Sequence, residues 1–415
     1  MQDRPTTIID RYQTIPIHHI LPGRETYAGL PEASFQESVM VRLPFMLAAL
    51  LAATALHAAP QVDVIATGLN NPRGLAFAPN GQLYVTEAGS GGNGRCLVLA
   101  DGRTACYGET GAITRVDPRG VAPPKRVIGD LPSLATQPDG FGGTGPQNIA
   151  FSARGEAAVA MGFGAESPAR NRVGRKAWLF GRVLQVSLRN GLNGADIATY
   201  EFAQNPVPGG ADSNLNGVAI VSGQTVVADA GANAIFSIAS DRTITTLAAF
   251  PARMVAAPPA LSLPPGATIP MQSVPTTVVD GKDCWLYVGE LTGFPFPVGS
   301  ANVYRVLPDG GLVQTYASGF TNIVALAFDR WQRLYVLEIG SGASFGSPPL
   351  RPPGRLLRVN PDGSRTVIYD QLFYPGGLAI GEDGAAYVTN NGVVPGPIPG
   401  GQFAAGGTVL RIGLD

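Results

Sequence analysis

The chain repeats a pattern in which a short apolar segment, a tight turn and a second apolar segment follow one another. In the clearest copy, Gly74-Leu75-Ala76-Phe77 leads through Pro79-Asn80-Gly81 into Leu83-Tyr84-Val85-Thr86-Glu87. Proline presets φ and Asn-Gly tolerates positive φ, so the middle of this copy predicts a turn between two strands. The second segment is β-branched and aromatic, as a half-buried strand is.

The pattern recurs at irregular periods of about 50–75 residues, which gives about six repeats. Third and fourth strands follow most copies, as in 356–359 and 366–369. Four short strands per repeat are typical of a β-propeller. The predicted fold class is therefore all-β, a six-bladed β-propeller with four-stranded antiparallel blades and long loops on one face. The other copies lie at 148–160, 217–229, 277–290, 325–338 and 377–390.

One strand-like segment, Gln61–Ala66, precedes the first copy and belongs to no repeat. We expect it to supply the outer strand of the last blade, beside Val409–Ile412. Such mixing of strands from the two ends closes the ring and ties the termini together.

The first 58 residues do not fit the repeat. Residues 1–39 have no sustained period, and we interpret them as an N-terminal extension outside any domain, from a start codon assigned too early. From Met40 the chain has a basic residue, an apolar run over 45–56 and the small-residue site Leu56-His57-Ala58. This layout predicts a signal peptide over 40–58, with the propeller over 59–415 and a secreted or periplasmic location. An N-terminal membrane anchor is the alternative.

Composition supports a globular domain and excludes some partners. Charged residues make up 14% of the chain and hydrophobic residues 45%, and the 54 glycines and 36 prolines suit many short strands joined by turns. Without 1–58 the chain is formally neutral. Neither nucleic acid nor a membrane surface is therefore an expected partner. We also expect no transmembrane segment in the mature chain, and a monomer.

The histidines limit the possible chemistry. His18, His19 and His57 are the three in the chain, and all lie in the part that we expect to be removed. A mature chain without imidazole has no Ser-His-Asp triad, no histidine base and no histidine-bound zinc. No cofactor is indicated with certainty, and a bound metal would be a hard cation held by oxygen, with Ca²⁺ the candidate.

Two of the three cysteines are placed to pair. Cys96 and Cys106 flank the hairpin signal Ala100-Asp101-Gly102, which predicts a disulfide in an exported protein. Cys284 precedes the strand-like Trp285–Val288, and we interpret it as a small core residue.

Long segments rich in Gly, Pro and Ser follow the second strand of most repeats and should crowd one face, where binding sites are usual. Polar residues at the starts of the first strands and the ends of the second strands should ring the channel mouth on that face. The five long segments are Ala88–Gly111, Gly162–Gly181, Leu291–Ala301, Ile339–Gly354 and Asn391–Gly407. The candidate ring residues are Arg73, Glu87, Asn148, Asn216, Asp229, Glu290, Asn322, Glu338 and Asn390.

Two interpretations of this ring are open. In the structural one, the acids at the strand ends accept hydrogen bonds from neighbouring loops and hold the blades in register. In the functional one, side-chain oxygens bind Ca²⁺ or a ligand on the axis. A basic and aromatic run over 170–180 could hold an anionic or aromatic ligand, although such runs are more often solvated loops.

The first two repeats resemble the ScyD/ScyE family of exported propeller proteins associated with scytonemin biosynthesis. The resemblance rests on Asn71–Phe77, Leu83–Gly89, the cysteine loop with Tyr107–Val116, and Gly142–Asn148. It implies a secreted or periplasmic six-bladed propeller and brings no catalytic residues with it. More remotely, the repeats resemble NHL-type blades and calcium-dependent lactonase and gluconolactonase propellers, which implies a possible Ca²⁺ set of Glu87, Asn148, Asn216 and Asp229.

Three functions are compatible with these residues. The leading hypothesis is an exported binding or accessory protein that holds a small molecule or a protein partner on its long-loop face, with a link to secondary-metabolite processing. The alternative is a Ca²⁺-dependent lactonase or hydrolase in which the metal polarises a carbonyl and activates water. A purely structural role is the third.

Overall fold

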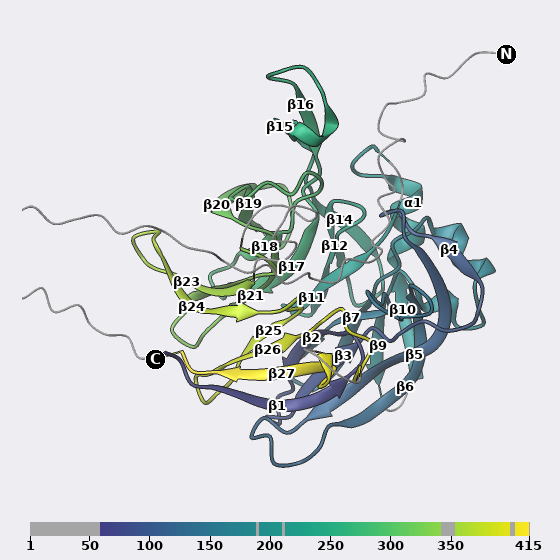
Figure 1. Ribbon diagram of the computed structural model, residues 1–415, viewed down its shortest axis with the longest axis vertical. Helices are drawn as coiled ribbons and strands as arrows, with labels where there is room; N and C mark the ends of the chain where they lie inside the picture. Colours follow the sequence, from purple (N-terminus) through teal and green to yellow (C-terminus); the bar gives the residue numbers. More distant parts are fainter. Residues whose placement is uncertain (1–58, 188–190, 210–211, 342–352, 399–402, 415) are drawn as a thin grey trace, which may run out of the picture. The chain divides into compact units, whose positions relative to one another are not determined.

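Six four-stranded antiparallel sheets follow one another along the chain and form a closed ring (Figure 1). The structure is a computed structural model that describes residues 59–187, 191–209, 212–341, 353–398 and 403–414. The predicted extension 1–39 and signal peptide 40–58 lie outside the described residues. The predicted six-bladed β-propeller is confirmed.

The first three blades take their four strands in sequence order, from the channel outward. Blade 1 is β2 (Pro72–Phe77), β3 (Leu83–Glu87), β5 (Thr104–Val116) and β6 (Lys125–Ala135), with the short β4 (Cys96–Val98) added to β5. Blade 2 is β7 (Pro146–Phe151), β8 (Ala157–Met161), β9 (Arg182–Ser187) and β10 (Gly191–Asp196). Blade 3 is β11 (Leu215–Val221), β12 (Gln224–Asp229), β13 (Ala234–Ile238) and β14 (Ile244–Ala249).

Blades 4 and 5 repeat this order, and blade 6 mixes the two ends of the chain. Blade 4 is β17 (Pro275–Asp280), β18 (Leu286–Glu290), β19 (Ala301–Val306) and β20 (Val313–Phe320). Blade 5 is β21 (Ile323–Phe328), β22 (Leu334–Glu338), β23 (Gly354–Val359) and β24 (Arg365–Leu372). Blade 6 is β25 (Leu378–Ile380), β26 (Ala386–Asn390), β27 (Gly407–Ile412) and β1 (Val62–Leu69).

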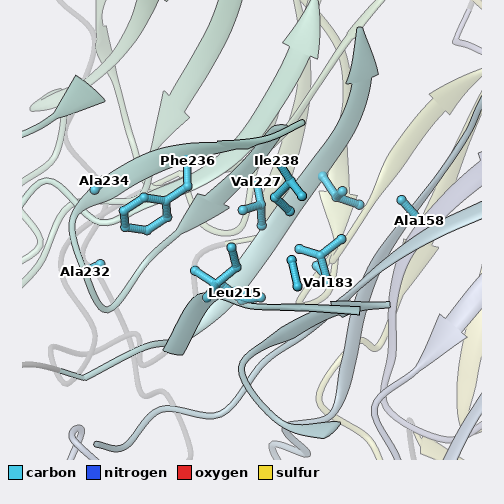
Figure 2. Close-up of a cluster of buried hydrophobic side chains, with 12 residues drawn as sticks. Ala158, Val183, Leu215, Val227, Ala232, Ala234, Phe236 and Ile238 are labelled. Carbon is cyan, nitrogen blue, oxygen red and sulfur yellow. The ribbon is translucent and has the colours of Figure 1, made fainter. Parts of the chain in front are cut away.

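Hydrophobic cores lie between the blades rather than within one blade. The core between blades 2 and 3 brings Val183 of blade 2 into one cluster with Leu215, Val227 and Phe236 of blade 3 (Figure 2). Val226, one residue along β12, belongs to the core on the other side of blade 3. Since successive strand residues point to opposite faces, a strand buried on both sides must be apolar throughout, which explains why the second strands show no polar alternation.

The ring closes as we expected. Strand β1 pairs antiparallel with β27, with Val62 opposite Ile412 and Val64 opposite Leu410, and the two ribbons run side by side in Figure 1. Ile65 and Leu69 of β1 enter the core between blades 6 and 1. A closed ring leaves each blade with a neighbour on both faces.

Threonine hydroxyls join neighbouring blades near the channel. Oγ1 of Thr86 in blade 1 donates to the carbonyl of Gln147 in blade 2, at 3.1 Å. Thr276 of blade 4 donates in the same way to Ile323 of blade 5, at 2.7 Å. Thr389 of blade 6 donates to the carbonyl of Arg73 in blade 1, at 2.6 Å, which links the last blade to the first.

Several elements lie outside the blades. The helix α1 (Ile197–Gln204) connects blades 2 and 3, and Asp196 caps its N-terminus by accepting a hydrogen bond from the Thr199 amide. A hairpin projects from the ring between blades 3 and 4 (Figure 1). The hairpin is formed by β15 (Arg253–Ala256) and β16 (Thr268–Met271). Short 3₁₀ helices span Ser167–Arg172, Ala177–Leu179 and Pro259–Leu261. No helix in the described ranges is long and apolar enough to cross a membrane.

The cysteine predictions have opposite outcomes. The disulfide between Cys96 and Cys106 is confirmed, and it joins β4 to β5 where we expected a hairpin. Cys284, by contrast, is exposed, and its interpretation as a core residue is wrong. The strand begins only at Leu286, because Lys282 and Cys284 adopt positive φ in the preceding turn.

Removal of residues 60–69 tests how much the closure stabilises the ring. We expect the free energy of unfolding to fall by at least about 4 kcal/mol, because Ile65 and Leu69 leave a buried core and β27 becomes an open edge. Chemical denaturation measures this. The matched control removes 257–267 and joins Ala256 to Thr268 through Gly-Gly, which shortens the projecting hairpin and should cost little. Equal losses in the two deletions would contradict the role of β1.

Candidate functional site

The starts of the six inner strands meet at one end of the channel. Gly74 lies against Asn148 of the next blade, Gly217 lies against Thr277, and Gly377 lies against the Arg73 carbonyl. A side chain at any of these glycines would collide with the neighbour, so close contact of the inner strands depends on them. Polar residues from several blades are thereby brought to the same mouth.

The carboxylate that ends the second strand of blade 1 is used within its own blade. Glu87 is 1% exposed. It accepts from the Asn70 amide at 2.6 Å, from the Thr114 hydroxyl and from Arg126 at 3.1 Å. These contacts fix the segment that leads into β2 against the ends of β3, β5 and β6.

Equivalent residues in three other blades do the same. Asp229 accepts from the Asn214 amide at 2.7 Å, Glu338 from the Thr321 amide at 2.8 Å, and Asn390 from the Phe373 amide at 2.6 Å. Each bond holds the segment before an inner strand to the end of the second strand. Burial raises the pKa of Asp229 and that of Glu338, although hydrogen bonds to the charged form oppose the shift.

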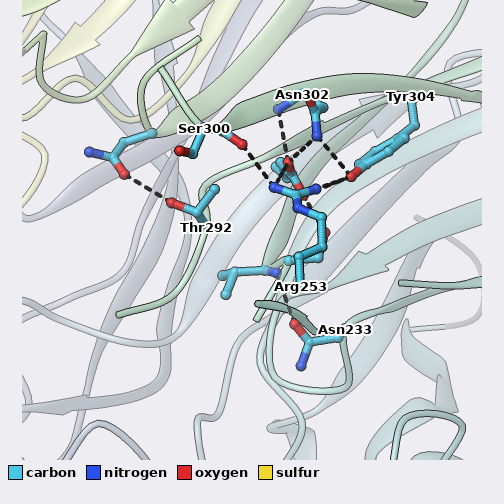
Figure 3. A network of polar contacts seen from close by, with 10 residues as sticks. Asn233, Arg253, Thr292, Ser300, Asn302 and Tyr304 are labelled. Atoms are coloured by element: carbon cyan, nitrogen blue, oxygen red, sulfur yellow. Dashed lines mark hydrogen bonds and ion pairs between the residues drawn. The ribbon is translucent and has the colours of Figure 1, made fainter. Parts of the chain in front are cut away.

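Blade 4 has the most extensive version of this contact (Figure 3). Glu290 is fully buried and accepts from Ser273 at 2.6 Å and from the Asn302 amide at 2.9 Å. Arg253 of the projecting hairpin pairs with it at 2.7 Å and also donates to Tyr304 and to the Ser300 carbonyl. The hairpin is therefore anchored to blade 4 through an ion pair whose carboxylate is fully buried.

Blade 2 lacks the contact. The residue opposite the start of β7 is Met161, which is fully buried and joins the core between blades 1 and 2. Blades 2 and 3 are instead joined by α1 and by a bridge between Ala165 and Ser213.

The candidate Ca²⁺ residues are arranged differently from a ligand set. Glu87 and Asp229 share no hydrogen-bond partner among the described residues. Asn148 directs Oδ1 to the amide of Ile149, and Asn216 lies half-buried near the start of β11. Within the same part of the chain, no three His, Cys, Asp or Glu side chains form a compact metal cluster. These contacts favour the structural interpretation of the acids at the strand ends.

Asn322 also has a backbone role. It is 3% exposed and adopts a left-handed φ of 52°, and its carbonyl accepts from the Ile339 amide at 3.0 Å. Asn71 holds the matching position in blade 1, with a φ of 49°. Asparagine tolerates this conformation better than most residues, which explains its recurrence before the inner strands.

The inserts of blades 1 and 2 build a small core of their own. Tyr107, Phe163 and Phe180 are buried together, and the rings of Phe163 and Phe180 stack at 5.4 Å. Arg170 is 6% exposed and pairs with Asp196 at 2.6 Å. Because Arg170 and Phe180 are buried, the interpretation of 170–180 as a solvated loop is wrong for these two residues, and they do not form a free basic surface.

Arg73 is the cation among the candidate ring residues, and no acid pairs with it in the described structure. Its Nη2 donates to the Gly143 carbonyl at 2.6 Å, while Nε is buried without a partner. Burial, and to a lesser degree the charge of Arg103, lowers the pKa of Arg73 to about 10. The guanidinium thus stays charged at neutral pH and has a donor to spare.

A second cation and several aromatic rings border Arg73. Arg103 donates to the carbonyl of Gly142 at 3.1 Å, one residue from the partner of Arg73. Phe141 precedes these two glycines and contacts Phe403, which contacts Phe373. Tyr374 packs against Phe373, three residues before Gly377, which lies against the Arg73 carbonyl. We call Phe141, Phe373, Tyr374 and Phe403 the aromatic group.

Sequence reasoning included Arg73 and missed the residues around it. Arg103 lies between the paired cysteines, where a basic residue at a hairpin tip carries no signal of a distant partner. The aromatic group comes from the connection after blade 1 and from two segments of blade 6. The closure of the ring, which was predictable, is what brings these segments together.

Comparison with known proteins identifies no family. No family model and no curated protein matches the chain. A streptogramin B lyase is 13% identical, with a TM-score of 0.46 over 86% of this chain and 98% of its own. The virginiamycin B lyase of Staphylococcus aureus is 12% identical, with a TM-score of 0.42 over 86% of this chain and 100% of its own. A Bacteroides thetaiotaomicron protein of unknown function is 8% identical, with a TM-score of 0.49 over 86% of this chain and 76% of its own. At these identities and TM-scores, the similarity to the lyases gives no information about the activity of this chain.

The substitution Glu290→Gln tests the structural interpretation of the acids. Removing the charge leaves Arg253 partly buried without its partner, so the free energy of unfolding should fall by about 2 kcal/mol. The usual cost of breaking a buried pair, about 3–5 kcal/mol, is reduced here because the Arg253 side chain is 35% exposed. Thermal unfolding against the exposed control Glu382→Gln measures the loss. A variant as stable as the control would contradict the interpretation.

Proposed function

We propose that this protein is a binding protein that holds a small anionic molecule at the channel mouth on the long-loop face. The observation that carries the proposal is the buried Nε of Arg73, a charged donor with no partner among the described residues. An unpaired buried charge costs free energy, and an anion that accepts from it recovers that cost. A guanidinium suits a carboxylate or phosphate, because its fixed fork can make two parallel hydrogen bonds.

The surroundings favour an anion that also has an apolar part. Arg103 adds a second positive charge near the same backbone segment; it pairs with Asp101 at 2.7 Å, and 40% of its side chain stays exposed. Phe141 and Phe403 are only partly buried and offer ring surface beside the glycines. An aromatic or otherwise apolar carboxylate combines both kinds of contact.

Binding is favoured over a calcium-dependent lactonase by the state of the acids. Glu87, Asp229, Glu290 and Glu338 accept hydrogen bonds from backbone amides, hydroxyls or arginines, so their oxygens already have partners. A hydrolase of the predicted type needs several such oxygens directed at one point on the axis, about 2.3–2.6 Å from the metal. Arg73, in contrast, has binding capacity that the fold itself does not use.

Two finer parts of the proposal concern the setting. Export to the periplasm or the medium is supported by the disulfide and by the sequence of 40–58. Membership of the ScyD/ScyE family, and with it a role near secondary-metabolite processing, is supported by the motifs of the first two repeats. An aromatic anionic ligand would fit such a role.

Isothermal titration of the full chain with benzoate, benzyl alcohol and inorganic phosphate tests the proposal. Benzoate should bind and benzyl alcohol should not, because the two differ mainly in the negative charge. In Arg73→Met the benzoate affinity should fall about 10- to 100-fold, the value of a charge-assisted hydrogen bond of about 1.5–3 kcal/mol. The control Arg119→Met removes a highly exposed cation and should bind like the wild type.

Stability separates this role from a structural one. If Arg73 serves a ligand, Arg73→Met should melt no lower than the wild type in the absence of ligand, because an unpaired buried charge is removed. A large loss of stability together with unchanged benzoate binding would overturn the proposal. So would equal binding of benzoate and benzyl alcohol.

A further inference from the structure

Helix α1 carries a buried carboxylate that lacks a partner. Glu201 is 1% exposed, and neither oxygen of its side chain accepts a hydrogen bond within the described residues. One turn later, Oδ1 of Asn205 is buried without a partner as well. Asp229, in comparison, accepts four hydrogen bonds. Three acceptor atoms on one helix end are thus left without donors.

The helix directs Glu201 toward the start of blade 3. The buried face of α1 consists of Ile197, Ala198 and Glu201, and Ile197 belongs to the core that contains Ala232. Glu201 follows Ile197 by one turn on the same face, so its carboxylate lies toward the turn after β12. Asp212 reaches this turn from the other side, since a side chain at Gly231 would collide with its carboxylate.

The described residues around Glu201 are acidic. The bridge between Ala165 and Ser213 places Glu166 next to Asp212. Burial, and then the charges of Asp229, Asp212 and Glu166, raises the pKa of Glu201 to about 8. Arg170 and Arg182, the arginines at the N-terminus of α1, both pair with Asp196, each at 2.6 Å. Once Glu201 gives up its proton, these groups offer only acceptor oxygens and negative charge, which a bound cation would stabilise.

We propose that Glu201, Asp212 and Oδ1 of Asn205 form a Ca²⁺ site at the C-terminal end of α1. All three contribute oxygen, which hard cations require, and two carboxylates favour a divalent ion. Calcium accepts irregular sets that combine carboxylate, amide and backbone oxygens with water, whereas magnesium demands a near-ideal octahedron. The ligands come from a helix and a separate loop, which suits the more tolerant ion.

The site would tie α1 to the start of β11, on the side of blade 3 that faces the blade without an acid at the strand end. It involves none of the residues first considered for calcium and does not depend on anion binding at Arg73. In blade 2 the buried Met161 replaces the acid found in the other blades. The metal would then supply a link between blades 2 and 3, whereas the strand-end hydrogen bonds of the other blades each lie within one blade.

Calorimetric titration of the chelator-treated full chain with CaCl₂, together with thermal unfolding, tests the site. We expect one Ca²⁺ per chain and a melting temperature that rises with its concentration. MgCl₂ should give a smaller shift. Glu201→Gln keeps the shape of the side chain and should weaken Ca²⁺ binding by at least about tenfold, as should Asp212→Asn. The control Glu382→Gln changes an exposed acid and should bind normally.

A gain-of-binding variant keeps the test decisive if Glu201→Gln fails to fold. Asn205→Asp adds a negative ligand at the same place and should bind Ca²⁺ more tightly than the wild type, while melting lower without the ion. Three results would overturn the proposal: no heat and no thermal shift in the wild type, an unchanged shift in Glu201→Gln, or weaker binding by Asn205→Asp.

Discussion

The antiparallel pairing of β1 with β27 is the interaction on which the rest of the structure depends. Each blade is a twisted sheet with two apolar faces, and it is stable only where both faces are covered. The pairing supplies blade 6 with its outer strand, brings Ile65 and Leu69 into the last core, and lets Thr389 bind the Arg73 carbonyl. Without closure, blades 1 and 6 would each expose an apolar face, and the channel would have no defined mouth.

Closure also explains why many polar residues at the mouth are not available for function. The chain must turn sharply before every inner strand, and each turn leaves backbone amides that need acceptors. Glu87, Asp229, Glu338 and Asn390 supply these acceptors, whereas Glu290 accepts from the Ser273 hydroxyl and from the Asn302 amide in β19. The residues with unused capacity are those that the turns do not need. Arg73 offers a donor and Glu201 offers acceptors, at different places on the same face.

The sequence predicted the fold well because its signals are local and repeated. The alternation of apolar segments and turns specifies strands, and strand-like residues at Gln61–Ala66 were enough to predict the closure. The site was harder to predict, since its properties come from contacts between distant segments. Arg73 and Glu290 look alike as charged residues at strand ends, and only the structure shows that Glu290 has Arg253 while Arg73 has no acid. Glu201 gave no signal, because a glutamate in a short helix is ordinarily exposed. The prediction for Cys284 failed for a related reason. Its apolar neighbour Trp285 suggested a buried strand, whereas the positive φ of the turn, which places Cys284 outside the strand, has no signal in the sequence.

The most direct test of the account is the NMR signal of the Arg73 Nε–H group, assigned by its absence in Arg73→Met. We predict that benzoate shifts this signal in the full chain while benzyl alcohol leaves it unchanged, because the carboxylate accepts from the buried Nε. If benzoate binds and other signals move but the Arg73 Nε–H resonance stays in place, the central claim that Arg73 holds an anion at the channel mouth is contradicted.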